Sequence, residues 1–190
     1  MEVGRRNLIF AKLSITSIAF AGCLGEPPDD SGDQSESPSA VEYEVLEFTA
    51  TSRIPDWTDP GGPSPGTLEA FDAADRAMAD LDFEEVDEDR RDEVERFVED
   101  TDFGAEFLLY VESEGPNSSY RELDIISLDV EEGTVVGTAE ARSVNDGPAD
   151  DAPMYPSVLV RVTPDEGWPD AVEITIVDGW DHAETLEVSP

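Results

Sequence analysis

Three residue types with distinctive chemistry are almost absent: the 190 residues include one cysteine, one histidine and one lysine. A lone cysteine has no partner for a disulfide. With one cysteine and one histidine, a zinc site would have to consist almost entirely of carboxylate ligands. A Ser-His-Asp site would need His182, which lies close in sequence to Asp178 and Asp181. The one Gly-x-Ser-x-Gly match, residues 62–66, lies in a loop rich in Pro and Gly and not at the strand-to-helix turn that a nucleophile elbow requires. We therefore expect no metal, no cofactor and no catalytic residue, and favour a protein that is not an enzyme.

Positive charge is also scarce, with 11 Lys and Arg against 47 Asp and Glu and a formal net charge of -36. The chain has no basic patch, which disfavours nucleic-acid binding. Self-repulsion of this size is severe where the Debye length is about 10 Å, and it weakens in molar salt, where that length is about 3 Å. The single lysine is Lys12, and every positive residue from Arg53 onward is arginine. This composition resembles that of halophilic archaeal proteins, which implies adaptation to high salt.

Long apolar runs are limited to one stretch near the N-terminus, Leu8 to Ala21. It is shorter than the roughly 20 residues that a transmembrane helix needs, and it follows two positive residues, Arg5 and Arg6. These features predict a signal peptide over residues 1–22. The arginine pair followed by Asn7-Leu8-Ile9 resembles a twin-arginine export signal, and that resemblance implies export of a protein that is already folded.

The only cysteine follows this apolar stretch directly. Phe20-Ala21-Gly22-Cys23 resembles a lipobox, in which the cysteine thiolate attacks a lipid donor and the small residues before it admit a peptidase. We predict lipidation of Cys23; cleavage without lipid is the alternative. A single lipid chain anchors a protein to a membrane only marginally, so a second lipid chain on the anchor is implied. The protein would be exported, with the membrane as its partner, and anchored to the outer face of the cytoplasmic membrane.

The segment after Cys23 differs in composition from the rest of the chain. Residues 24–40 consist mainly of Pro, Gly, Ser, Asp and Glu, with one large apolar residue. Such a segment cannot bury enough surface to offset its chain entropy. We predict a disordered acidic tether over residues 23–40, with a typical reach of roughly 20–25 Å, and one globular domain over residues 41–190.

Within the domain, apolar periodicity predicts helices early and strands late. Three- and four-residue spacing favours two helices, over residues 67–81 and 87–99. Runs of alternating or continuous apolar residues favour strands near 41–51, 107–111, 123–130, 134–142, 158–162, 172–176 and 185–188. Short connections between strands favour antiparallel pairing. The fold class is therefore α+β, with a largely antiparallel sheet of five to seven strands, a sandwich being one arrangement, and two helices before the main strand run.

Two resemblances follow from these motifs. The leader, lipobox and acidic domain together resemble haloarchaeal lipoproteins exported by the twin-arginine route. Residues 103–178 are similar to the C-terminal domain of the PrcB protease-complex subunit, in the order of Phe107–Val111, Gly115–Tyr120, a hairpin and Tyr155–Val160. The turn departs from that family, since Ser119-Tyr120 stands where Gly-Tyr is usual. Either resemblance implies a β-rich interaction module and not an enzyme.

A few surface features are candidates for function. Asn117-Ser118-Ser119 is an N-glycosylation sequon in an expected turn, which marks Asn117 as a modification site in an exported protein. Trp57, Trp168 and Trp180 lie in or beside loops rich in Gly and Pro. Trp168 and Trp180 are candidates for a binding surface, because Trp contributes heavily to interfaces; the alternative is that the tryptophans cap the ends of the core.

Acidic runs at residues 84–89 and 146–151 supply oxygen ligands that calcium accepts, but neither has the spacing of an EF-hand. We expect these runs to be solvated surface. The sequence thus favours a surface lipoprotein whose domain binds a protein or a small ligand. A secreted hydrolase that uses carboxylates and a structural envelope component remain alternatives.

Overall fold

The computed structural model describes residues 39–190 apart from 51, 53, 55–63, 145–148 and 166. The predicted signal peptide, with Arg5 and Arg6, lies outside the described residues, as do Cys23, Trp57 and nearly all of the predicted tether. None of the described helices is long and apolar enough to cross a bilayer.

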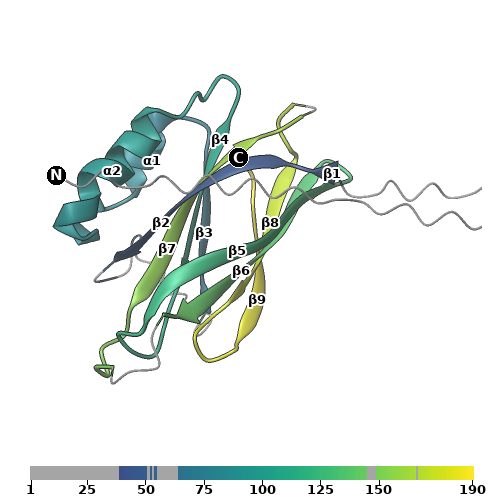
Figure 1. Cartoon of the computed structure of the whole chain (residues 1–190). Helices are drawn as coiled ribbons and strands as arrows, with labels where there is room; N and C mark the ends of the chain where they lie inside the picture. Colours follow the sequence, from purple (N-terminus) through teal and green to yellow (C-terminus); the bar gives the residue numbers. More distant parts are fainter. Residues whose placement is uncertain (1–38, 51, 53, 55–63, 145–148, 166) are drawn as a thin grey trace, which may run out of the picture. The chain divides into compact units, whose positions relative to one another are not determined.

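Two β-sheets form the framework of the domain (Figure 1). The five-stranded sheet has the order β1 (Ser39–Ala40), β5 (Tyr120–Glu131), β6 (Thr134–Ser143), β8 (Ala171–Val177) and β9 (Ala183–Val188). The four-stranded sheet has the order β2 (Glu42–Ala50), β7 (Tyr155–Thr163), β4 (Phe107–Ser113) and β3 (Gly66–Phe71). All neighbouring strands are antiparallel except β6 and β8, which are parallel. The prediction of a largely antiparallel sheet is confirmed.

Helices α1 (Ala74–Asp80) and α2 (Glu88–Glu99), with a short 3-10 helix at Phe83–Glu85, connect β3 to β4. The prediction of two helices before the main strand run is also confirmed. The first helix is shorter than predicted, because residues 66–71 form strand β3 instead. The described residues contain nine strands rather than five to seven, since the sequence pattern predicts neither β1 nor β3 as a strand.

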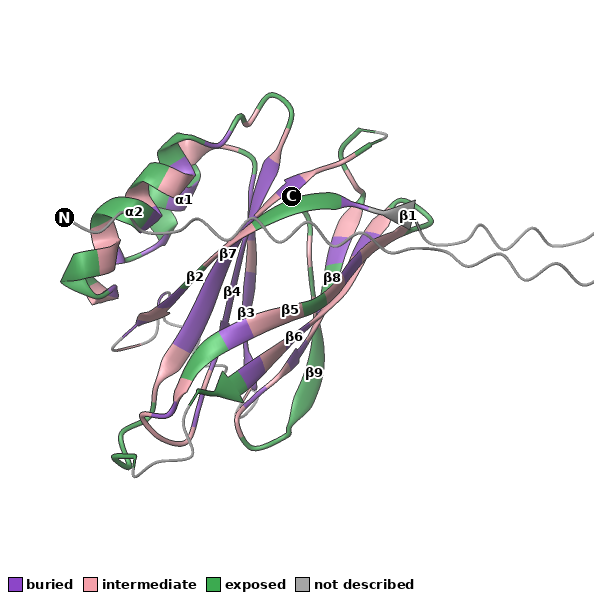
Figure 2. Cartoon of the chain, in the orientation of Figure 1, coloured by how far each residue is buried: buried purple, intermediate pink, exposed green. Residues whose placement is uncertain are grey.

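The core has two layers, one on each face of the four-stranded sheet (Figure 2). Between the sheets, Leu109 and Val160 pack in the same apolar cluster as Leu123 and Ile174 of the five-stranded sheet. On the other face, the helices cover a second apolar cluster, which includes Leu108, Tyr110, Leu159, Val94 and Val98. Burial on both faces explains why residues 107–111 read as a continuous apolar run.

Strand register defines two ends of the domain. At one end, which we call the β1 end, Ser39 pairs with Val130 beside the hairpin turn between β5 and β6. Glu132 and Gly133 in that turn have φ of 51° and 85°, as a tight hairpin requires. At the other end, Tyr120 at the start of β5 pairs with Ser143 at the end of β6. Ten residues separate Tyr120 from Val130, so at about 3.3 Å per residue the two ends lie roughly 30 Å apart.

Candidate functional site

Three loops meet at the end opposite β1, and we call residues 114–119, 149–154 and 178–182 the distal loop end. Backbone hydrogen bonds connect these loops to one another. Gly115 and Met154 exchange two, with N···O distances of 2.8 and 3.2 Å, and the Ser118 amide donates to the Asp150 carbonyl at 3.0 Å. The Gly179 amide donates to the Glu114 carbonyl at 3.0 Å. These hydrogen bonds connect the three loops to one another.

Asp178 organises the turn between β8 and β9. Its buried carboxylate accepts hydrogen bonds from the amides of Trp180 and His182, at 2.8 and 2.9 Å, while its second oxygen lies 3.0 Å from His182 Nδ1. Asp181, at φ 64°, completes the turn. The turn leaves Trp180 46% exposed, so a large aromatic ring is displayed on a backbone that local hydrogen bonds fix.

The pairing of His182 with Asp178 has the geometry of a histidine base and its orienting carboxylate. The His182 side chain is 74% exposed, and among the described residues it forms no hydrogen bond with a hydroxyl or thiol nucleophile. Asp181 does not contact it in any hydrogen bond of the described residues. The observed contacts of Asp178 serve the shape of the turn that presents Trp180 and His182.

The sequon lies in the same end of the molecule. Asn117 Oδ1 accepts hydrogen bonds from the Ser119 amide at 2.9 Å and from the Ser119 hydroxyl at 2.6 Å. Asn117 is half-buried, while Ser119 is buried against Ser143 of β6. The predicted turn is confirmed, and its side-chain contacts are more elaborate than the three-residue pattern indicates.

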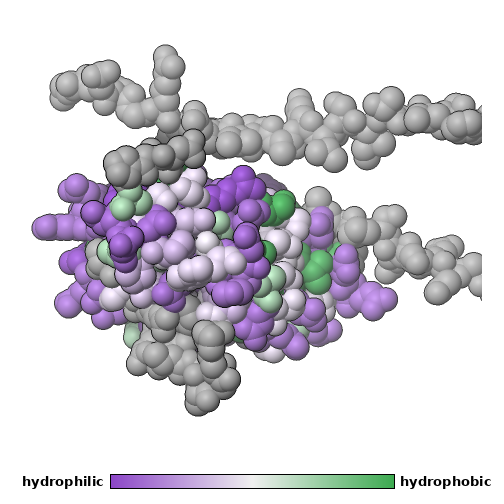
Figure 3. Space-filling model, turned by 90° about the horizontal axis from the view of Figure 1, so that it is seen from below, coloured by the Kyte–Doolittle hydropathy of each residue, from purple (hydrophilic) through white to green (hydrophobic). Residues whose placement is uncertain are grey.

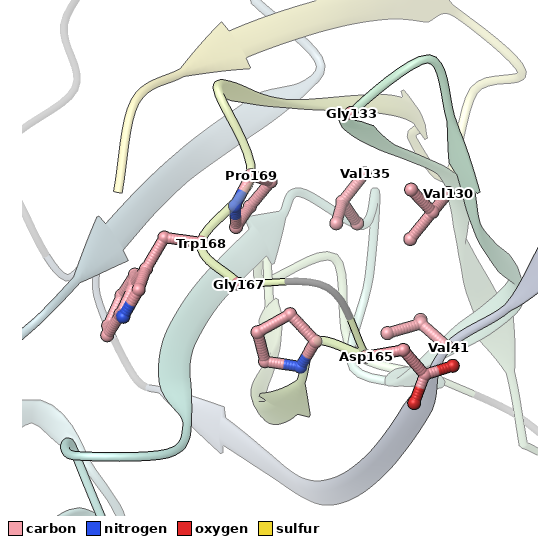
Figure 4. Close-up of a pocket in the computed structure, with 9 residues that line it drawn as sticks. Val41, Val130, Gly133, Val135, Asp165, Gly167, Trp168 and Pro169 are labelled. Atoms are coloured by element: carbon pink, nitrogen blue, oxygen red, sulfur yellow. The ribbon is translucent and has the colours of Figure 1, made fainter.

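Trp168 lies at the β1 end, in the loop between β7 and β8. Its ring packs against Phe107 with centroids 5.7 Å apart, and the residue is 45% exposed. Beside it is a cavity of about 170 Å³ whose apolar wall includes Val41, Val130 and Val135 (Figure 4). The Asp165 carboxylate lies next to Val41, and the Trp168 ring is turned away from the three valines. This cavity has room for one apolar side chain and is smaller than the roughly 300–1,000 Å³ typical of small-molecule pockets.

A buried polar cluster connects strands β4 and β7 to Ile54, and the sequence analysis missed it. Glu112 is fully buried and accepts hydrogen bonds from the Ile54 amide, at 2.9 Å, and from the Tyr110 hydroxyl. Ser157 Oγ lies 3.3 Å from the same hydroxyl. Burial, with the Glu112 charge beside it, raises the pKa of Tyr110 well above its ordinary value. The alternation of Leu108, Tyr110 and Glu112 along β4 is the only sequence signal that could have placed these groups on one face.

The acidic runs do not converge in the part of the chain that the structure covers. Residues 84–89 span the end of the 3-10 helix and the start of α2, while 146–148 lie outside the described residues. Across the described ranges, no three His, Cys, Asp or Glu side chains are grouped as metal ligands. Comparisons with family models, with curated proteins and with solved structures find no match in any of the three.

Proposed function

We propose that this chain is an exported surface protein, anchored to the outer face of the cytoplasmic membrane by lipid on Cys23, whose domain binds a partner protein through the distal loop end. The observation that carries the proposal is the separation of the two ends. The predicted tether, residues 23–40, ends in β1, and the three connected loops lie roughly 30 Å from β1 along β5. A domain held from the β1 end presents its opposite end to the surroundings of the cell.

The loops suit protein recognition for a physical reason. Binding costs conformational entropy for each flexible group that it immobilises. Trp180 stands in a turn already fixed by Asp178 and by the Gly179–Glu114 hydrogen bond, so little further ordering is needed. Seen from below, hydrophilic residues cover much of the described surface and strongly apolar residues form small patches (Figure 3). A fixed aromatic ring within a polar surround is the usual arrangement of an energetically dominant interface residue.

The acidic composition belongs to the same proposal. A domain facing an outside medium of molar salt has its carboxylate repulsion screened, and its charge keeps it soluble there. The resemblances to haloarchaeal twin-arginine-exported lipoproteins and, over residues 103–178, to the PrcB C-terminal domain point to the same class of role, a non-enzymatic interaction module.

The test uses two tryptophans with nearly equal exposure at opposite ends of the domain, Trp180 and Trp168. A photo-crosslinking amino acid replaces one or the other in the full chain, expressed in a host that grows in molar salt. We expect a discrete crosslinked species on intact cells from position 180 and not from position 168. Equal yields from both positions, or none from 180, would contradict the proposed face.

Anchoring is measured in the same cells with Cys23→Ser. We expect the native chain to begin at Cys23, to carry added lipid mass and to sediment with membranes, while the variant is released. A native chain that retains Met1 and stays in the cytoplasm would overturn export and anchoring together.

A further inference from the structure

Asn117 is the only asparagine of the chain that lies in a sequon. The sequence has two others, Asn7 and Asn145, and neither is followed at the second position by Ser or Thr. Asn117 is half-buried in the loop between β4 and β5, and so its side chain reaches the surface of the distal loop end.

The hydrogen bonds fix which way the amide points. A backbone N–H can only donate, so the atom that faces the Ser119 amide at 2.9 Å is Oδ1. The Ser119 hydroxyl donates to the same oxygen at 2.6 Å. Nδ2 thus points away from Ser119, and no described residue accepts a hydrogen bond from it.

The two donors also favour the chemistry of modification at Nδ2. Loss of a proton from Nδ2, which makes this nitrogen nucleophilic toward the sugar, builds negative charge on Oδ1. Hydrogen bonds to the charged form stabilise it, and donors already in place require no reorganisation. The pair formed by the Ser119 amide and hydroxyl is a small, ready-made stabiliser of this kind.

The surrounding loops preserve this arrangement in the folded state. The Ser143 hydroxyl donates to Ser119 Oγ at 2.8 Å, and the Val144 amide donates to the Ser119 carbonyl at 2.9 Å. Ser118 exchanges hydrogen bonds with the backbone of Asp150 at 3.0 and 2.9 Å. A protein that crosses the membrane already folded would therefore carry the sequon across in this shape.

We propose that Asn117 is N-glycosylated on the folded protein, an inference that rests on the proposed export. The co-reactant is a sugar linked to a membrane lipid through a phosphate. A bond forms between Nδ2 and the anomeric carbon, and the carbon–oxygen bond to phosphate breaks with its electron pair leaving on the phosphate. The Nδ2 proton passes to a base of the transferase.

The glycan would border the turn that displays Trp180. Pro116, the residue before Asn117, packs so closely on Gly179 that a Cβ there would lie 2.4 Å from Pro116 Cδ. The distal loop end would then carry both a fixed aromatic ring and a sugar, and the sugar would limit which partners can approach.

The experiment is peptide mapping by mass spectrometry of the full chain, purified from the membranes of a salt-adapted host that N-glycosylates exported proteins. We expect glycan mass on the peptide that contains Asn117 in molecules that begin at Cys23. Asn117→Gln removes this mass, whereas Asn145→Gln and Ser119→Thr, which keeps the sequon and its hydroxyl, retain it.

The possible failures can be told apart. Molecules that begin at Cys23 and carry an unmodified Asn117 overturn glycosylation and leave export standing. Molecules that retain Met1 and carry no glycan overturn both. The decisive reading is made on the wild-type chain, so misfolding of Asn117→Gln cannot obscure it.

Discussion

At the scale of single residues, the hydrogen bond between the buried side chains of Tyr110 and Glu112 contributes to the free energy of unfolding. Tyr110→Phe removes a hydroxyl that donates to Glu112 Oε2 while leaving the aromatic ring in its cluster. The same carboxylate oxygen keeps its hydrogen bond from the Ile54 amide, so the substitution removes one hydrogen bond to a charged group, which contributes about 1.5–3 kcal/mol. We expect the free energy of unfolding to fall by this amount, measured by denaturant titration in molar salt.

The control for this substitution is Tyr43→Phe, since Tyr43 is 40% exposed on β2. Surface changes of this kind usually stay within about 0.5 kcal/mol. Equal effects at the two tyrosines would show that the Tyr110 hydroxyl is not a net contributor to stability.

Some contacts of single residues can be predicted from the sequence, and others cannot. The sequon turn at Asn117 follows from local chemistry, and the hairpin turn at Glu132-Gly133 lies between the strands predicted near 123–130 and 134–142. The partners of Glu112 and Tyr110 cannot be predicted from local sequence, because their hydrogen bonds with Ile54 and Ser157 join residues more than 40 positions apart. Among the tryptophans, exposure of Trp168 and Trp180 fits either a binding role or a cap on the core.

At the scale of elements, β3 is where helical spacing misled the prediction. Leu68 and Phe71 are three residues apart, as on one face of a helix, but Leu68 packs between the sheets and Phe71 packs on the helix side. Burial on both faces of a strand removes the period-two pattern that marks a half-exposed one. The same reason explains the adjacent apolar residues Val45 and Leu46 of β2, which pack against opposite layers.

Gly66→Ala tests the close packing of strand β3 against its neighbours. In strand β3, the added Cβ would lie 2.1 Å from the Glu112 carbonyl and 3.0 Å from Ile176 of β8, so backbone must move. We expect a loss of about 1–3 kcal/mol in unfolding free energy, as for overpacked cores.

The matched variant for this test is Gly104→Ala, where the nearest atom would be an Asp102 carboxylate oxygen at 3.2 Å in an exposed loop. A smaller change is expected there because that side chain can move. Stabilisation by Gly66→Ala would contradict the pairing of β3 with β4.

At the scale of the whole molecule, the strand content and the antiparallel bias follow from the sequence, while the division into two sheets does not. Short connections correctly place β5 beside β6 and β8 beside β9. The parallel pairing of β6 with β8 depends on β7 leaving for the other sheet between them, and no local pattern records which sheet a strand joins. The separation of the two ends, on which the proposed binding face depends, follows from that topology.

The net charge of -36 makes a prediction for the molecule as a whole. Carboxylate repulsion opposes the compact state and is screened as the Debye length falls from about 10 Å at 0.1 M to about 3 Å at 1 M salt. We expect the melting temperature to rise steeply between 0.1 M and molar sodium chloride at pH 7. Salt also strengthens apolar burial, so the charge contribution must be separated from that effect.

Protonation separates the two contributions. Near pH 4, roughly the ordinary pKa of Asp and Glu, much of the negative charge is neutralised. Glu47 and Glu69, whose pKa values are raised chiefly by burial, gain protons first as the pH falls, and the folded state binds those protons more tightly than the unfolded chain does. The ionised forms of Glu47 and Glu69 therefore destabilise the folded state fully at pH values above their raised pKa, and this destabilisation disappears as the pH falls. If repulsion among carboxylates governs the salt requirement, the slope of melting temperature against salt should be much smaller near pH 4 than at pH 7; equal slopes would assign the requirement to apolar burial instead.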